Sequence, residues 1–63
     1  MGKFWTGEFS IEAEKPNGEK ESFEYAKRKL EILDSGTVVV TRYDGYGNET
    51  RTTILPPGTK VSM

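Results

Sequence analysis

The stretch LEILDSGTVVV, residues 30–40, predicts a β-hairpin. Two runs rich in leucine, isoleucine and valine flank the turn signal Asp34-Ser35-Gly36. A three-residue hairpin loop of this kind ends in a left-handed residue, a position that glycine takes without a steric penalty from a Cβ atom. The loop sets the register of both strands, and apolar side chains then meet on one face. The expected cross-strand pairs are Leu33–Thr37, Ile32–Val38 and Leu30–Val40.

Three further turn signals that end in glycine divide the rest of the chain into strands. They are Pro16-Asn17-Gly18, Gly45-Tyr46-Gly47 and Pro56-Pro57-Gly58. The first two fit the same three-residue loop, and the third fits a type II turn with proline and glycine at its centre. Five antiparallel strands are therefore expected. The additional expected pairs are Ile11–Phe23 and Phe9–Tyr25 in the first hairpin, and Val38–Ile54, Val40–Thr52 and Arg42–Thr50 in the third.

These registers gather apolar side chains on one face of the predicted sheet. The inward positions are odd-numbered up to Tyr25 and even-numbered from Leu30, so the alternation slips once within residues 26–29. A β-bulge there would fold the first hairpin over the three strands that follow. The last strand, residues 59–63, would then pair with the first. The expected core consists of Trp5, Phe9, Ile11, Phe23, Tyr25, Leu30, Ile32, Val38, Val40, Ile54 and Val61.

The predicted fold class is all-β, a five-stranded antiparallel meander that curls into a small barrel. Its outline is similar to SH3-like or Sm-like barrels, an analogy that does not assign a function. An alternative is a β-α-β-β arrangement with a helix over residues 23–33, where four apolar residues recur at helical spacing. That helix would end at Asp34, which would place a carboxylate at the negative end of the helix dipole. It would also abandon the apolar matches between strands, so the all-β arrangement is preferred.

The chain of 63 residues is expected to form a single small β domain over residues 1–63. It contains no histidine and no cysteine, which removes the commonest general base, the thiol nucleophile and the usual zinc ligands. The acidic residues fall on predicted outward positions or hairpin tips, where nothing would desolvate them and raise a pKa. We therefore expect no enzyme activity, no small-molecule substrate, no cofactor and no metal site.

Nine lysine and arginine residues against ten acidic ones give a net charge of −1. This balance argues against a protein that coats nucleic acid through its overall charge. No apolar run is long enough for a signal peptide or a membrane span, so a cytoplasmic protein that does not bind membranes is expected. A domain this small has a lean core, and without disulfides or a metal it gains stability most readily by association. A homo-oligomer or a complex with a protein partner is therefore expected.

The predicted outward face of the meander carries an apolar group and a basic group. The apolar group is expected to contact protein, although single hydrophobic residues are also common on surfaces. The basic group combines lysine and arginine with tyrosine, as single-stranded nucleic acid prefers, although a solvated sheet face has the same composition. The expected protein-contact residues are Leu33, Val39 and Leu55, and the possible nucleic-acid-binding residues are Lys27, Lys29, Arg51, Tyr43 and Tyr46.

The sequence thus favours a non-enzymatic interaction or assembly module that self-associates or docks a protein partner. Binding of single-stranded nucleic acid is the alternative function. Two acidic residues expected on the same face, Glu31 and Glu49, weaken the attraction of that face for phosphates.

Overall fold

The computed structural model describes residues 2–63, which form one antiparallel sheet of five strands. The strands are β1 (Lys3–Glu14), β2 (Lys20–Ile32), β3 (Val38–Tyr43), β4 (Glu49–Leu55) and β5 (Lys60–Ser62). Their order across the sheet is β4-β3-β2-β1-β5. The all-β prediction is confirmed, and the alternative helix over residues 23–33 is wrong because this segment continues β2 as far as Ile32.

The three predicted hairpin loops are confirmed by their backbone hydrogen bonds. In the first loop the Lys15 amide donates to the Glu19 carbonyl at 2.8 Å, and the Gly18 amide donates to the Lys15 carbonyl at 2.9 Å. Equivalent bonds close the loops at residues 33–37 and 44–48. Only glycine takes positive φ here without strain. The φ angles of the closing glycines are 90° for Gly18, 89° for Gly36 and 86° for Gly47.

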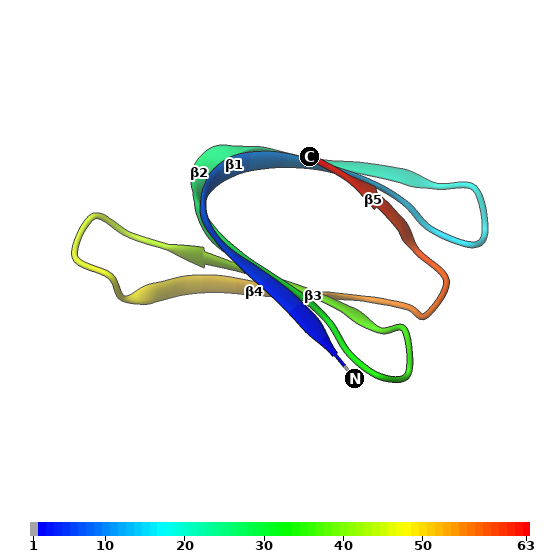
Figure 1. Ribbon diagram of the computed structural model, residues 1–63. Helices are drawn as coiled ribbons and strands as arrows, with labels where there is room; N and C mark the ends of the chain where they lie inside the picture. The colour runs from blue at the N-terminus through cyan, green and yellow to red at the C-terminus, as the bar shows by residue number, and fades with distance from the viewer. Residues whose placement is uncertain (1) are drawn as a thin grey trace.

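β1 and β2 are the longest strands, with 12 and 13 residues. Figure 1 shows both strands turning back midway, so that their hairpin end lies over β3 and β4. After the turn at residues 56–59, β5 pairs with β1 at Glu12, Ala13 and Glu14, as predicted for the last strand. β4 and β5 remain the two edges of the sheet. The sheet is therefore open, and the expected closed barrel is not confirmed.

A β-bulge in β2 accompanies the bend. Ile11 pairs with Phe23 as predicted, but Phe9 pairs with Ala26, so that two residues of β2 lie opposite Ser10. The sequence placed this slip at residues 26–29, slightly too late along the strand. The extra residue reverses the inward–outward alternation of β2 before Tyr25 rather than after it. Tyr25 therefore points outward and is 68% exposed instead of lying in the core.

A second bulge, which the sequence did not reveal, lies in β4. Tyr43 pairs with Glu49, but Arg42 pairs with Arg51, so Thr50 is the extra residue. The Thr50 hydroxyl donates a hydrogen bond to the Arg42 carbonyl at 3.2 Å. The bulge moves the register of β4 by one residue, and a shift of one residue exchanges the two faces of a strand. The predicted pairs Val38–Ile54, Val40–Thr52 and Arg42–Thr50 are therefore all wrong by one residue of β4.

The β4 shift exchanges the predicted roles of two neighbouring residues. Leu55, expected on the surface, pairs with Val38 and is 1% exposed. Ile54, expected in the core, is 69% exposed.

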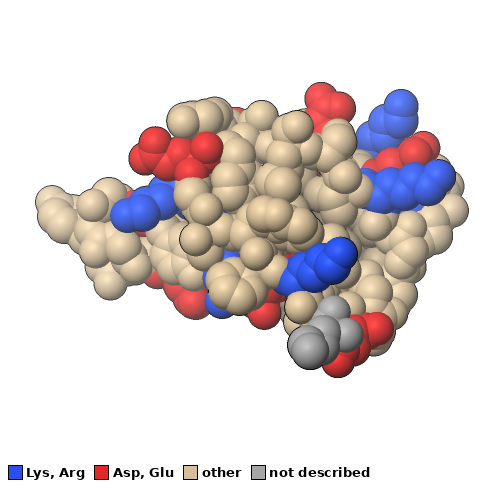
Figure 2. All heavy atoms as spheres, viewed as in Figure 1, with Lys and Arg blue, Asp and Glu red and all other residues tan. Residues whose placement is uncertain are grey.

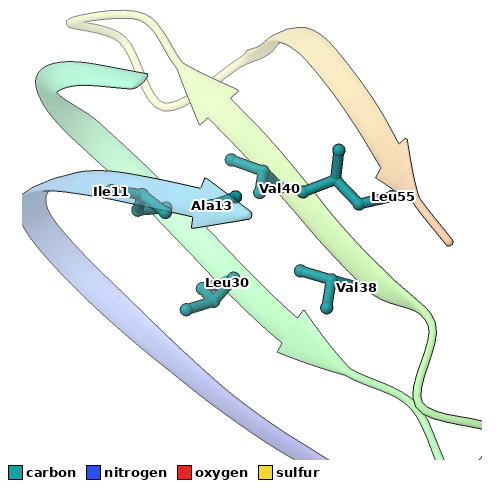
Figure 3. Packing of buried hydrophobic residues seen from close by; sticks show 6 residues of the cluster. All are labelled: Ile11, Ala13, Leu30, Val38, Val40 and Leu55. Atoms are coloured by element: carbon teal, nitrogen blue, oxygen red, sulfur yellow. The ribbon is translucent and has the colours of Figure 1, made fainter. Parts of the chain in front are cut away.

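The core lies between the folded-over hairpin and the meander. Figure 3 shows Ile11 and Ala13 of β1 facing the buried side chains of β2, β3 and β4. Trp5, another expected core residue, is 40% exposed because it belongs to a strand edge that no other strand within residues 2–63 covers. The buried apolar residues are Ile11, Ala13, Leu30, Val38, Val40 and Leu55, and Phe9, Phe23, Ile32 and Val61 pack against them.

Replacing the buried leucine of β4 should destabilise the protein far more than replacing its exposed neighbour. Leu55→Ala leaves a cavity in a small core and should lower the free energy of unfolding by about 2 to 5 kcal/mol. Ile54→Ala should change it by less than about 0.5 kcal/mol, as for exposed positions in general. Urea unfolding followed by tryptophan fluorescence measures both. A larger loss for Ile54→Ala would show that β4 has the register without the bulge.

The loop between β3 and β4 contains a carboxylate, that of Asp44, whose protonation is linked to folding. One Asp44 oxygen accepts hydrogen bonds from the backbone amides of Asn48 at 3.0 Å and Tyr46 at 2.8 Å. The bond from Asn48 has the largest effect, followed by that from Tyr46, and they hold the pKa of Asp44 below its ordinary value of 3.8. A depressed folded pKa stabilises the protein above the unfolded pKa, and this stabilisation is lost as the pH falls through the folded pKa.

Asp44→Asn should therefore flatten the acid limb of the stability curve. The neutral side chain keeps an acceptor oxygen but has no proton to bind as the pH falls below the ordinary carboxyl pKa of 3.8. The free energy of unfolding of the unmodified protein should fall more steeply over this range than that of the variant, as measured by urea unfolding at successive pH values. Parallel curves would show that the charge of Asp44 does not contribute.

Candidate functional site

The apolar group predicted for protein contact is not assembled as expected. Leu33 is 42% exposed and Val39 is half-buried, but Leu55 belongs to the core and is inaccessible to a partner. The bulge in β4 is the physical reason, because it places Ile54 rather than Leu55 on the outer face, the side of the sheet away from the core. Ile54 and Val39 lie in one cross-strand row with Glu31 and Phe4.

The basic group predicted for nucleic acid is divided by the same shift. Thr52 lies in the outer-face row of Lys29 and Thr41. The side chain of its neighbour Arg51 therefore leaves the backbone on the opposite face of the sheet. The Lys29 ammonium is 3.6 Å from a Glu31 carboxylate oxygen and 5.5 Å from the centroid of the Phe4 ring. The Lys29 ammonium group, which was expected to be free for phosphate, therefore already interacts with these two neighbours.

Part of the basic group does come together beside the β3–β4 loop. Lys27, Tyr43 and Arg51 line a shallow hollow of about 670 Å³, together with the acidic residues Glu8 and Asp44. Lys29 does not line it, and Tyr46 lies outside it with 92% of its surface exposed. Figure 2 shows acidic and basic side chains interspersed on the face in view. This arrangement offers no continuous positive track for a nucleic-acid strand.

A free strand edge is the first feature that the sequence did not reveal. β5 pairs with β1 only at residues 12–14, so residues 3–11 have a strand on one side alone in the part of the chain that the structure describes. This free edge of β1 contains two exposed aromatic residues, Phe4 at 63% and Trp5 at 40%. Its unpaired backbone amides and carbonyls are a template for another strand. The aromatic residues of this segment were visible in the sequence, but the sequence did not show that β5 is too short to cover them.

A row of three arginines is the second such feature. Arg28, Arg42 and Arg51 lie directly opposite one another on β2, β3 and β4. They project from the face that carries Leu30, Val40 and the rest of the core, hereafter the inner face. Like charges in direct cross-strand pairs destabilise a sheet unless other groups compensate them. This row depends on the β4 bulge, without which Arg51 would face outward.

Glu24 provides the compensation that the structure shows. The Nε and Nη2 atoms of Arg28 donate to the Glu24 carbonyl oxygen at 3.0 and 2.7 Å. Arg42 Nη1 donates to a Glu24 carboxylate oxygen at 3.0 Å. Arg28 is only 5% exposed, and its guanidinium carbon lies 5.6 Å from the centroid of the Phe23 ring. Burial, followed by the charge of Arg42, lowers the pKa of Arg28, while Glu24 opposes this shift.

The arginine row opens onto a cleft on the inner face. The cleft has a volume of about 430 Å³ and lies between the bulged part of β2 and strands β3 and β4. Its lining residues are Glu21, Ser22, Phe23, Glu24, Arg28, Val40, Arg42, Arg51 and Thr53.

Comparisons with known proteins do not assign a family to this chain. No family model matches it, and neither the curated proteins nor the solved structures contain a significant match. Within residues 2–63 there is no helix that is long and apolar enough to cross a membrane. In the same residues no group of three acidic side chains is placed to hold a metal ion. The prediction that the chain is not an enzyme remains a prediction.

Glu24→Gln should destabilise the sheet in a manner that salt suppresses. The substitution removes the carboxylate charge that offsets the repulsion between the arginines, but it keeps the backbone carbonyl that accepts from Arg28. Because both side chains of the Arg42–Glu24 pair are substantially exposed, the loss at low salt should be no more than about 1 kcal/mol. It should shrink in 1 M sodium chloride, where the Debye length is about 3 Å.

The measurement is urea unfolding of both proteins at low and high salt. Glu19→Gln is the control, because Glu19 pairs with Lys15 at 3.8 Å in a loop outside the arginine row. A loss for Glu24→Gln that is equal at both salt concentrations would rule out charge compensation.

Proposed function

We propose that the chain is a non-enzymatic assembly module that associates with a second copy of itself by pairing the free edges of β1. The observation that carries this proposal is the absence of a strand beside residues 3–11 of β1 among the residues that the structure describes. A small SH3-like barrel left open between β4 and β5 is the architecture that we assign to the module. This analogy describes the shape only and does not support the function.

The free edge of β1 is the most suitable of the exposed edges. Natural edge strands are protected from pairing by proline, bulges, charges or shortness. β4 carries the bulge at Thr50 and the exposed charges of Glu49 and Arg51. β5 has only three residues. By contrast, the free part of β1 contains no proline, and the neighbouring bulge lies in β2, so β1 itself stays regular. Its two exposed charges, Lys3 and Glu8, are of opposite sign and flank the aromatic pair of this edge.

A second copy fits this edge for reasons of symmetry. Two antiparallel strands related by a two-fold axis perpendicular to the sheet pair residues of the same face. An axis at Thr6 satisfies this condition and places Trp5 of each copy opposite Gly7 of the other. A large aromatic ring opposite glycine covers exposed backbone, and a threonine pair at the axis is a favourable cross-strand combination. A Cβ atom at Gly7 would have only the Phe9 ring nearby, at 3.9 Å, so there is space for the tryptophan of a second copy.

The energetic need for association follows from the small core. Within residues 2–63 only six apolar residues are buried, whereas Phe4, Trp5 and Ile54 remain exposed. A domain of about 60 residues buries only about 60% of the surface exposed by its unfolded chain. Pairing of the β1 edges would satisfy exposed backbone groups and cover the tryptophan, and both effects add to the stability of the folded state.

Thr6→Pro should convert the protein to a monomer. Proline removes an amide donor from the middle of the free edge and is among the devices by which natural edges avoid pairing. Thr6→Val is the matched control, because valine has nearly the shape of threonine and retains the amide. Analytical ultracentrifugation should show a dimer for the unmodified protein and the valine variant, and a monomer with an unchanged far-UV spectrum for the proline variant.

Two results would contradict the proposal. One is a monomer for the unmodified protein at millimolar concentration. The other is a dimer in the proline variant that matches the unmodified protein, which would place the contact elsewhere.

A further inference from the structure

We propose that the cleft on the inner face binds a phosphate monoester that also carries an ammonium group. The arginine row, Arg28, Arg42 and Arg51, would hold the phosphate, and Glu21 would hold the ammonium group. The proposal rests on the composition of the cleft and does not depend on self-association through β1.

The arginine row concentrates positive charge in one place. Its three guanidinium groups come from directly opposed positions on three adjacent strands, and the only carboxylate that contacts any of them within residues 2–63 is that of Glu24. Arginine presents several donors in a planar fork that fits phosphate oxygens in pairs. A dianion at this point would relieve the repulsion within the row and receive charge-assisted hydrogen bonds.

The three arginines differ in how firmly they are held. Arg28 is fixed by two bonds to the Glu24 carbonyl and by the Phe23 ring. Arg42 is held by one bond to the Glu24 carboxylate. The Arg51 side chain has no hydrogen bond or ion pair among the described residues, and it is exposed. The row therefore combines one guanidinium group that is held in place, that of Arg28, with donors that are still unused. This arrangement lowers the ordering cost of binding an anion.

Glu21 supplies a charge of the opposite sign in the same cleft. Its Oε2 atom is inaccessible to solvent and has no hydrogen-bond partner in residues 2–63. A buried carboxylate oxygen without a donor is unfavourable, and structures seldom retain one without a reason. The cleft is therefore lined by arginine donors and by a carboxylate with an unused acceptor oxygen, which a rotation of the Glu21 side chain would turn toward a ligand. A ligand with a phosphate and an ammonium group complements both.

The remaining lining fits a small ligand of this class. The hydroxyl group of Thr53 can donate to phosphate oxygens, while Phe23 and Val40 provide apolar wall. The cleft volume of about 430 Å³ lies within the range of small-molecule sites. A nucleic-acid strand would instead need an extended basic track, and the acidic side chains around the cleft oppose one.

Titration with O-phosphoethanolamine, inorganic phosphate and ethanolamine tests the proposal. The readout is the set of arginine Nε–H resonances in proton–nitrogen correlation spectra at constant ionic strength. Both phosphate compounds should shift the signals of the arginine row, and phosphoethanolamine should bind about tenfold more tightly because Glu21 adds a charge-assisted hydrogen bond. Ethanolamine alone should leave the signals of the arginine row in place.

Two variants and one control separate the parts of the site. Arg51→Gln should weaken the binding of both phosphate compounds about tenfold, since Arg51 has no other partner to maintain among the described residues. Glu21→Gln should weaken only phosphoethanolamine, to the level of phosphate. Lys60→Gln removes the same charge as Arg51→Gln from a residue that does not line the cleft, and it should have no effect.

Three outcomes would overturn the proposal. The first is no shift of the arginine signals with either phosphate compound at millimolar concentration. The second is equal weakening by Arg51→Gln and Lys60→Gln, which would indicate attraction to overall charge. The third is tighter binding of a thymidine oligonucleotide than of phosphoethanolamine, which would identify a nucleic-acid groove instead.

Discussion

The extra residue in β2 is the constraint on which the rest of the structure depends. By placing Glu24 and Tyr25 opposite Ser10, it lets the first hairpin turn back over β3 and β4 while both of its halves keep their apolar side chains inward. Without the bulge, the alternation that buries Ile11 would direct Leu30 to the opposite face. A sheet of five strands can then enclose a core without a second sheet or a helix.

The same bulge also positions an acceptor residue, Glu24, beside the arginines of the inner face. It brings the Glu24 carbonyl and carboxylate within reach of Arg28 and Arg42, so one residue at the bend contacts two cations of the row. The second bulge, at Thr50, adds Arg51 to that row and moves Leu55 into the core. Sheets often use bulges to redirect side chains in this way. In this chain the two irregularities create the cleft as well as the curvature.

The sequence predicted what the turns determine and failed where a bulge intervenes. Gly18, Gly36 and Gly47 mark loops of known geometry, so the pairs next to each loop could be derived, including Ile32–Val38. The bulge at Thr50 carries no glycine and depends on a threonine hydroxyl that reaches a backbone carbonyl. A one-residue shift then misplaced Leu55, Ile54 and Arg51 together. The free edge of β1 was missed for another reason, because its exposure depends on how far β5 extends in space.

Gly7 connects the two surfaces that we have proposed for assembly and for ligand binding. It pairs with Arg28, so it forms the β1 end of the cross-strand row that contains the arginines. In the proposed dimer the same glycine lies opposite Trp5 of the second copy. Covering Gly7 would restrict the strand that flanks Arg28, while a ligand on Arg28 would order the strand that forms the edge. If either event changes the affinity of the other, thermodynamic linkage requires the change to be equal in both directions. The open sheet would thus place the proposed assembly contact and the proposed ligand site on opposite sides of one short segment.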